Sequence, residues 1–279
     1  MTGKQGMASM SDIIRAAAKA GEPDRYLAAL LAPPAVRDDL VVLAAFTAEI
    51  NRIPLIAREP QLAEIRLQWW LDNLLVSPWR ATGHPIADAF ADVLMRRSIS
   101  KDLVENWLNT LAHTFYPEPP KDEALLDLEL DSIEGSPFLF AALICGEPMR
   151  EQLCLQTRHA GIAYGMARLG LYGAAQSLAR GRVPLPLRLE TGFSEGAGAV
   201  STCLKTYVSS KTRAALTLAK DDFRRGSRAL RTALLPVAMV EPYLRALEMP
   251  SHDAAHDVGE VAPLVRVIRI AWAGFRGRL

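Results

Sequence analysis

Residues 40–50 have the sequence LVVLAAFTAEI, in which apolar residues recur with the period of a helix. Steps of three and four residues separate Leu40, Leu43, Thr47 and Ile50, as on one face of an α-helix. Residues 62–76 repeat the pattern with an apolar stripe made of Ala63, Leu67, Trp70 and Leu74. Pro54 and Pro60 separate the two segments. The pattern predicts two consecutive helices that each bury one face.

The helical period continues along the rest of the chain. It covers residues 88–97, 102–113, 125–145, 151–171, 197–233, 236–247 and 261–276. Alternating strand patterns are few, and neither a long linker nor an internal repeat interrupts the series. We therefore expect a single all-α domain over residues 21–279, preceded by a flexible N-terminal extension over residues 1–20.

Composition excludes several classes of protein. Half of the 279 residues are hydrophobic and 23% are charged, which excludes an intrinsically disordered chain. Three cysteines are too few for a disulfide framework and suit a reducing compartment. Lysine and arginine together number 32 against 31 acidic residues, so the chain lacks the basic excess of a nucleic-acid binder. We expect no nucleic-acid partner.

Both ends of the chain bear on its location. Residues 1–11 are polar and lack the apolar core of an export signal, and no apolar run is long enough to span a bilayer. We therefore expect a cytoplasmic protein. Residues 261–279 contain four arginines, several large apolar residues and no acidic residue. They fit either peripheral contact with the inner face of the cell membrane or a terminal helix that covers the core.

Several local clusters have a plain structural interpretation. The acidic pairs Asp38-Asp39 and Asp221-Asp222 fit solvated helix faces better than metal sites, because adjacent helical residues point about 100° apart. His252 and His256 are four residues apart and could share a metal, but they lie in a polar loop with Asp253 and Asp257 and have no cysteine or third histidine nearby. Gly161 and Gly165 predict close packing of two helices. We predict no metal site from these residues.

Six short stretches stand out along the chain: DRYLAALLAP at 24–33, LAAFTAEI at 43–50, EIRLQWW at 64–70, GIAYGM at 161–166, RGRVPLP at 180–186, and residues 233–247. In sequence and order they resemble conserved segments of the squalene/phytoene synthase family over about residues 20–273. The resemblance implies an isoprenoid-synthase-like helical bundle around a central apolar cavity. Enzymes of that family join two prenyl diphosphates head to head, using Mg²⁺ held by two aspartate-rich motifs on facing helices.

This chain departs from the family at both motifs. The first motif, Cys-Arg-x-x-Asp-Asp in the family, is TAEINR at 47–52, so the aspartates are replaced by Asn51 and Arg52 and Glu49 is the only acid. The second motif falls on RLGLY at 168–172, and residues 159–189 contain no acidic residue. The resemblance therefore places two degenerate motifs at the cavity mouth, Glu49, Asn51 and Arg52 on one side and Tyr164, Arg168 and Tyr172 on the other. It further implies Arg66 and Arg182 as phosphate contacts.

Without these carboxylates, the chain lacks the residues that hold Mg²⁺ in the family, so we do not expect the family's usual catalysis. No residue is assigned a catalytic role, and no cofactor is expected, with Mg²⁺ required only if the chain is an enzyme. The motifs are most similar to an aspartate-poor branch that contains the mitochondrial complex I assembly factor. This implies a non-catalytic assembly factor or chaperone whose partners are complex I subunits or assembly proteins. Two alternatives remain: an active transferase of farnesyl or geranylgeranyl diphosphate in isoprenoid biosynthesis, and an isoprenoid-binding protein that holds a prenyl lipid in its cavity.

Overall fold

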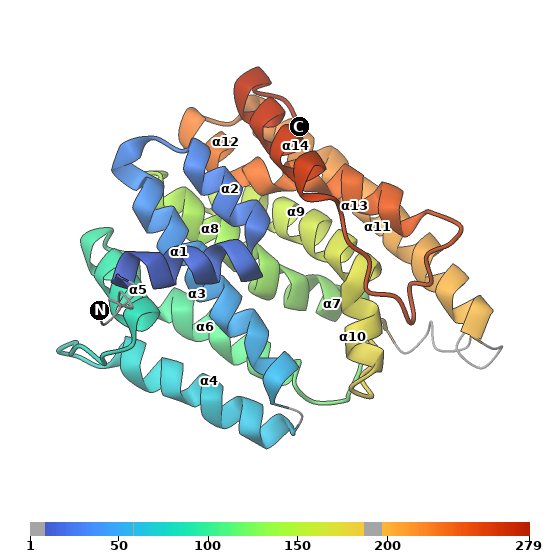
Figure 1. Cartoon of the computed structure of the whole chain (residues 1–279), viewed down its shortest axis with the longest axis horizontal. Helices are drawn as coiled ribbons and strands as arrows, with labels where there is room; N and C mark the ends of the chain where they lie inside the picture. Colours follow the sequence, from blue (N-terminus) through green and yellow to red (C-terminus); the bar gives the residue numbers. More distant parts are fainter. Residues whose placement is uncertain (1–8, 58, 187–196) are drawn as a thin grey trace, which may run out of the picture.

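All regular structure in the described residues, 9–57, 59–186 and 197–279 of a computed structural model, is helical (Figure 1). The first half contains α1 (Met10–Gly21), α2 (Pro23–Leu31), α3 (Pro34–Ile56), α4 (Pro60–Leu75), α5 (Pro85–Arg96), α6 (Lys101–His113) and α7 (Glu123–Leu130). The second half contains η1 (Asp131–Gly135), α8 (Ser136–Ile144), α9 (Glu151–Arg168), η2 (Leu169–Gly173), α10 (Ala174–Leu178), α11 (Ala197–Arg225), α12 (Arg228–Leu234), η4 (Leu235–Met239), α13 (Val240–Leu247) and α14 (Pro263–Arg276). The predicted all-α fold is confirmed.

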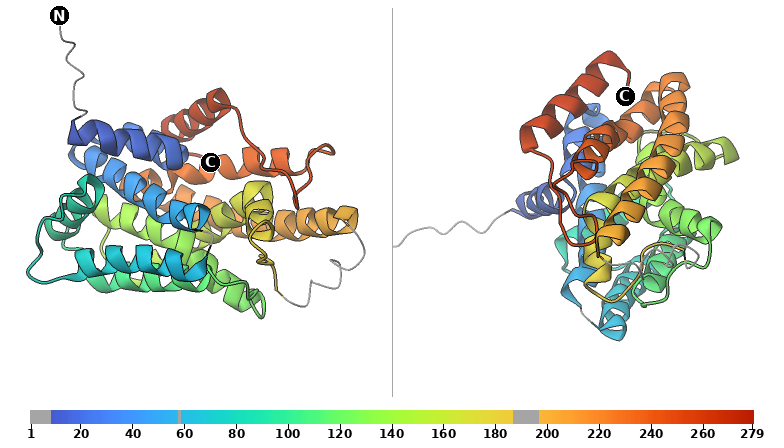
Figure 2. Two further views of the ribbon diagram at one scale, coloured as in Figure 1. Left: turned by 60° about the horizontal axis from the view of Figure 1, so that its bottom comes forward. Right: turned by 90° about the vertical axis from the view of Figure 1, so that its right-hand side faces the viewer.

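Two long helices organise the bundle. α9 packs along α11 and also contacts α8, α13 and η1, whereas α3 packs against α1, α2, α5 and α8. The two further views place α4 and α14 on opposite outer sides of the molecule (Figure 2). Within the described part of the chain, every helix is too short or too polar to cross a membrane.

Four aromatic rings join α3 to its neighbours. The ring of Phe46 stacks on Phe90 at a centroid distance of 3.9 Å. Trp70 and Trp107 present their edges to Phe46 at 5.3 and 5.4 Å. All four side chains are buried, and each large buried aromatic removes apolar surface from water, so this cluster holds α3, α4, α5 and α6 together.

Three local expectations are wrong. Residues 10–20 are not a flexible extension, because they form most of α1, which starts with a capping box between Ser9 and Asp12 and buries Ile14 and Ala18. Pro54 does not end the helix of residues 40–50, because α3 continues to Ile56. Pro54 lies in its last turn, where the missing N–H removes only one hydrogen bond near the helix end. The expected helix over 197–233 is two helices, since Ser227 caps the start of α12.

Two π-helical turns interrupt the predicted long helices. η1 lies between α7 and α8, and η2 lies between α9 and α10. Such turns contain one extra residue per turn and redirect the side chains around them. Glu134 of η1 and Tyr172 of η2 both line one large cavity.

Gly161 and Gly165 let η1 lie directly against α9. A Cβ atom at Gly161 would stand 2.5 Å from the backbone of Gly135, and one at Gly165 would stand 3.0 Å from Cγ of Glu134. Neither distance is compatible with a side chain unless the neighbour moves. The structure confirms that these glycines serve close helix packing.

We expect Gly161→Ala to lower the free energy of unfolding by about 1–3 kcal/mol, because the new methyl group meets backbone atoms that cannot rotate away. Gly173→Ala is the matched control, since its Cβ would first meet Leu169 at 3.4 Å, an ordinary contact. Urea unfolding of both variants measures the difference. Equal stability of the two variants would contradict this account of the α9–η1 contact.

Candidate functional site

A cavity of about 810 Å³ opens between the C-terminal half of α3, the two π-helical turns, α9 and the segment 258–266. Its apolar lining includes Leu111, Leu126, Leu130, Ile133, Leu169 and Leu171. Polar side chains gather where the start of α2 meets α9. The cavity therefore combines an apolar interior with one polar end, as small-molecule sites commonly do.

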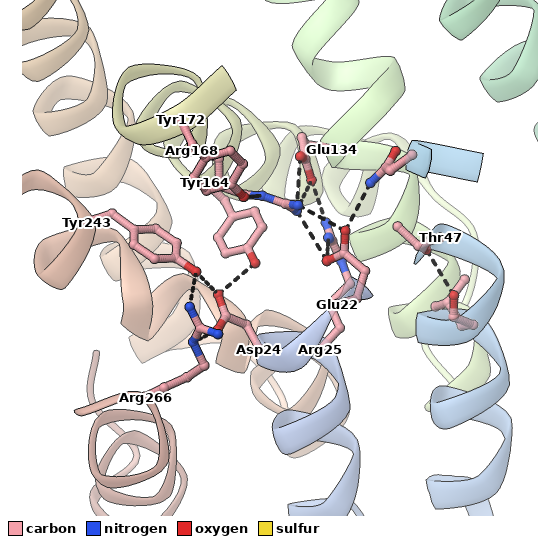
Figure 3. A network of polar contacts seen from close by, with 12 residues as sticks. Glu22, Asp24, Arg25, Thr47, Glu134, Tyr164, Arg168, Tyr172, Tyr243 and Arg266 are labelled. Atoms are coloured by element: carbon pink, nitrogen blue, oxygen red, sulfur yellow. Dashed lines mark hydrogen bonds and ion pairs between the residues drawn. The ribbon is translucent and has the colours of Figure 1, made fainter. Parts of the chain in front are cut away.

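Glu22, at the junction of α1 and α2, is the centre of the polar end (Figure 3). Its carboxylate is 1% exposed and accepts hydrogen bonds from three different helices. Arg25 Nη1 donates to Oε2 at 2.6 Å, Arg168 Nη2 donates to Oε1 at 3.0 Å, and Asn51 Nδ2 donates to Oε1 at 2.9 Å. Glu22 thereby links α2, α3 and α9 through one carboxylate.

Glu134 of η1 closes this arrangement into a ring of alternating charge. Arg25 Nη2 donates to Oε2 of Glu134 at 2.7 Å, and Arg168 Nη1 lies 3.2 Å from Oε1. Glu22, Arg25, Glu134 and Arg168, hereafter the charged ring, thus contain two carboxylates and two guanidiniums. The charges balance within the ring, which is the condition under which buried ionised groups are tolerated.

The ring neighbours control one another's ionisation. Burial by itself would raise the pKa of Glu22, but the guanidiniums of Arg168 and Arg25 outweigh it and hold that pKa at about 2. Burial likewise disfavours the charged form of Arg168, yet Glu134 and Glu22 raise its pKa well above the usual value. Glu22 and Arg168 are therefore both charged at neutral pH.

Every nitrogen of Arg168 already donates a hydrogen bond inside the protein. Its Nε donates to the hydroxyl of Tyr172, while Nη1 and Nη2 are engaged by the carboxylates of the ring. Its guanidinium also lies over the ring of Tyr164 at 5.1 Å. Burial raises the pKa of Tyr172 to about 12, so its hydroxyl stays protonated at neutral pH. Arg168 is built into the wall of the cavity.

Asp24 forms a second buried cluster beside the ring. Its Oδ2 accepts a hydrogen bond from Tyr164 Oη at 2.8 Å and another from Tyr243 Oη. Arg266 Nε lies 2.8 Å from Oδ1, an ion pair without hydrogen-bond geometry. Burial raises the pKa of Asp24, against the opposing effect of Arg266. This cluster connects the start of α2 to α13 and α14.

Further ion pairs surround the cavity. Arg52 pairs with Glu49 at 3.1 Å on the exposed side, and Arg182 pairs with Glu129 at 2.9 Å where both are largely buried. Arg180 also lines the cavity and, in the described part of the chain, has no carboxylate partner. Among the described residues, Arg180 is thus the cavity arginine without an ion-pair partner.

The structure brings together seven of the eight predicted site residues. The cavity is lined by Glu49, Asn51, Arg52, Tyr164, Arg168, Tyr172 and Arg182. The two degenerate motifs are joined directly, because Asn51 and Arg168 donate to the same oxygen of Glu22. Arg66 lies elsewhere: it is exposed on α4 and does not line the cavity, because the buried face of that helix is formed by Leu67 and Trp70.

Sequence reasoning missed the partners of these residues. Glu22, Glu134, Tyr243 and Arg266 were not predicted, although Asp24 and Arg25 lie in one of the quoted stretches. The spacing of Glu22 and Arg25 by three residues at a helix start was a usable signal for an ion pair. Glu134 gave no local signal, since its partners lie far along the chain.

The residues present do not fit a magnesium–diphosphate site. Mg²⁺ requires carboxylate oxygens that are free to coordinate it, and those of Glu22, Asp24, Glu49, Glu129 and Glu134 are already paired with arginines. Among the described residues that line the cavity, this leaves the exposed Glu260 as the one unpaired carboxylate, too few for a site that needs several anionic ligands. Within the described ranges, no group of three His, Cys, Asp or Glu side chains is arranged to hold a metal. The predicted solvated faces are found only in part. Asp221 pairs with Arg224 and Arg225, and His256 pairs with Asp253, on partly or fully exposed surfaces. Asp39, in contrast, is buried against Arg96 and Arg97. The side chain of Asp222 is 16% exposed and pairs with His159.

Comparisons with known proteins agree with the helical architecture. The profile of the family described as squalene/phytoene synthase matches residues 18–267. No curated protein matches the chain in sequence.

Three solved structures resemble the chain in fold. A dehydrosqualene synthase in complex with ligand has a TM-score of 0.73 at 14% identity, over 96% of both chains. TcSQS with the ligand E5700 has a TM-score of 0.71 at 10% identity, over 96% of this chain and 89% of that one. Squalene synthase HpnC from Alicyclobacillus acidocaldarius has a TM-score of 0.68 at 12% identity, over 85% of this chain and 92% of that one.

Arg168→Met should lower the free energy of unfolding by about 3–5 kcal/mol, because it leaves the carboxylates of Glu22 and Glu134 buried with only Arg25 between them. Arg52→Met is the control. Its pair with Glu49 involves an arginine side chain that is 59% exposed, so we expect a loss below about 1 kcal/mol. Chemical denaturation of both variants tests the contrast, and similar losses would refute a structural role for the charged ring.

Acid should weaken the fold through Glu22. Its pKa is about 2 in the folded chain against an ordinary value of 4.5, so its contribution is complete above pH 4.5 and lost as the pH falls toward 2. The loss should reach about 3 kcal/mol, since one pKa unit corresponds to about 1.4 kcal/mol. In Glu22→Gln, the free energy of unfolding should fall less steeply over the same interval. A parallel pH dependence in the two proteins would exclude Glu22 as the titrating group.

Proposed function

The chain belongs to the squalene/phytoene synthase family, and we propose that it is a member without diphosphate-ionising catalysis that acts as an assembly factor for respiratory complex I. The observation that carries the first part is the charged ring. Glu22 and Glu134 are neutralised by Arg25 and Arg168 at the end of the cavity where the two degenerate motifs meet.

The charges of the ring oppose the family reaction. Ionising an allylic diphosphate leaves a highly charged anion, which must be stabilised by cations that are free to approach it. In this chain, each guanidinium nitrogen of Arg168 is already engaged by Glu22, Glu134 or Tyr172. The carboxylates of Glu22 and Glu134 are held by arginines, so they are poorly available as ligands for Mg²⁺. A binding or scaffolding role fits such a closed polar network better than a reaction that must generate and stabilise charge.

The proposed role in complex I assembly rests on similarity to the aspartate-poor branch, at TAEINR in α3 and at GIAYGM in α9. A surface for a protein partner is available on α4. Leu62, Ile65 and Trp69 lie on one face of that helix and are 49%, 65% and 39% exposed. Contiguous exposed apolar side chains of this kind mark protein-contact surfaces in soluble domains. We assign the partner contact to this face.

The cavity supports a second candidate function, the binding of a prenyl lipid. Its volume of about 810 Å³ is within the range of sites for small organic ligands, and several leucines line it. Among the described residues of the cavity, Arg180 has no ion-pair partner and is available to a phosphate or other anionic head. Native mass spectrometry of gently purified protein should then detect a lipid adduct, and a clean apo mass would count against this candidate.

The proposal predicts that a non-hydrolysable farnesyl diphosphate analogue will not stabilise the protein in a Mg²⁺-dependent way. A ligand at about 100 times its dissociation constant raises the free energy of unfolding by about 2.7 kcal/mol, which thermal unfolding detects readily. A shift that requires Mg²⁺ would overturn the proposal in favour of an active prenyl-diphosphate transferase. A shift without Mg²⁺ that disappears in Arg180→Met would support the lipid-binding candidate.

The proposed role in complex I assembly is tested by deleting the gene in its own host. NADH–quinone oxidoreductase activity of the membranes should fall and return with the wild-type gene. Ile65→Glu, on the exposed face of α4, should not restore it, whereas Met95→Glu, at a side chain that is 50% exposed on α5, should. Normal complex I activity in the deletion strain would contradict the assembly role and leave the catalytic question to the binding experiment.

A further inference from the structure

α14 has its apolar side turned away from the protein. Leu264, Ile268, Trp272 and Phe275 follow one another at steps of four, four and three residues and so lie on one helix face. They are 69%, 54%, 52% and 88% exposed. Helices that cover a core normally bury such a face. Here the views of Figure 2 place α14 on the outside of the molecule.

Polar anchors fix the helix in this orientation. Arg266 reaches inward to buried Asp24 at 2.8 Å, and Arg269 Nη2 donates to Glu241 of α13 at 2.9 Å. On the same face of the helix, Ile270 and Ala273 supply the buried contact and are 1% and 2% exposed. Rolling the helix to bury its apolar face would strip Asp24 of its cation inside the protein, so the outward face is a stable feature of the fold.

Arginines surround the C-terminal end of the exposed face. Arg276 lies over the ring of Trp272 at 4.2 Å, and Arg278 follows it. Arg231 of α12 is adjacent, because its Nη1 would lie 3.3 Å from a Cβ on Gly277. None of these three arginines has a carboxylate partner among residues 9–57, 59–186 and 197–279. Residues 261–279 contain no acidic side chain.

We propose that α14 docks the protein onto an anionic lipid bilayer, with the Leu264–Phe275 face inserted among the head groups and Arg231, Arg276 and Arg278 in contact with their phosphates. An apolar face that contains Trp and Phe and is bordered by arginines is the pattern of helices that lie in a membrane interface. Arginine also forms paired hydrogen bonds with phosphate oxygens. The inference is independent of the proposed role in complex I assembly.

The charge of the patch favours a lipid bilayer over a second copy of the chain as the surface that covers α14. A two-fold contact would place the same patch on both sides and bring unpaired arginines against arginines, with no carboxylate to offset the repulsion. A bilayer instead supplies many phosphates and needs no directional match. The length of the exposed stripe, about three turns of helix at 3.6 residues per turn, suits insertion parallel to the membrane plane.

The position of α14 relative to the cavity adds to the argument. Val258, Gly259, Val261 and Pro263 line the cavity and lead directly into the exposed face of α14. Docking of that face would therefore bring this wall of the cavity next to the lipid head groups. A long apolar molecule could then pass between bilayer and cavity without crossing much water.

Flotation of the full-length protein with lipid vesicles tests the proposal. We expect binding to vesicles of phosphatidylcholine mixed with phosphatidylglycerol, and much weaker binding to phosphatidylcholine alone. Ile268→Glu should weaken binding about tenfold or more, because a carboxylate is placed in the apolar face and against anionic lipid. Met95→Glu is the matched control on α5, where the replaced side chain is similarly exposed at 50%, and should change binding less than about twofold.

Charge is tested separately with the double variant Arg276→Glu, Arg278→Glu. It should lose the preference for phosphatidylglycerol, and raised salt should weaken the wild type in the same direction. Absence of wild-type binding to either vesicle would overturn the proposal. So would equal binding by wild type and Ile268→Glu, provided that thermal unfolding confirms both are folded. A dimer that Ile268→Glu converts to a monomer, without vesicle binding, would assign the face to self-association instead.

Discussion

A buried charge must have a partner inside the protein, and the charged ring satisfies this requirement for Glu22, Arg25, Glu134 and Arg168 together. Each carboxylate faces two guanidiniums, and each guanidinium faces two carboxylates. The cost of burying any one of them is recovered only when the other three are present. Because these residues come from the start of α2, from η1 and from α9, the ring sets how those elements meet.

Several features of the backbone follow from this constraint. Gly161 and Gly165 let η1 approach α9 closely enough for the side chain of Glu134 to reach Arg168. The π-helical turn η2 begins just after Arg168 and presents Tyr172 to its Nε. Asp24, two residues after Glu22, extends the polar contacts to Arg266 and thereby fixes α14 with its apolar face outward. The short stretch from Glu22 to Asp24 therefore joins the polar end of the cavity to the outer helix α14.

The sequence predicts the helices well, because a helix that buries one face has apolar residues every three or four positions, and this spacing is visible in the sequence alone. It fails where the outcome depends on a second element. Residues 10–20 form a helix that packs on α3, and their apolar content alone did not distinguish that helix from an extension. Arg66 belongs to a recognisable motif, but which flank of α4 reaches the cavity depends on how the helix is rotated against its neighbours.

The site shows the same division. Asn51 and Arg168 could be placed at one cavity mouth because the resemblance aligns their helices, and they do share an oxygen of Glu22. Glu134 could not be recognised in advance, because its partners Arg25 and Arg168 lie on distant helices whose packing the sequence does not show. Glu22 gave only the local signal of its spacing to Arg25, and its contact with Arg168 depends on the fold. Glutamates are mostly solvated, so only the three-dimensional contacts distinguish the few that are buried.

A guanidinium and a metal ion are alternative partners for the same carboxylate oxygens, and the difference between them is mobility. Mg²⁺ can arrive with a diphosphate and follow its charge as a bond breaks. Arg168 is attached to the chain, carries a charge that cannot be removed at any physiological pH, and is fixed by four contacts to Glu22, Glu134 and Tyr172. It supplies positive charge that stabilises the folded protein, but that charge cannot shift toward a leaving group without breaking the ring. In this chain the cation at the centre of the cavity wall is therefore part of the fold, and what remains for a ligand is the apolar volume beside it.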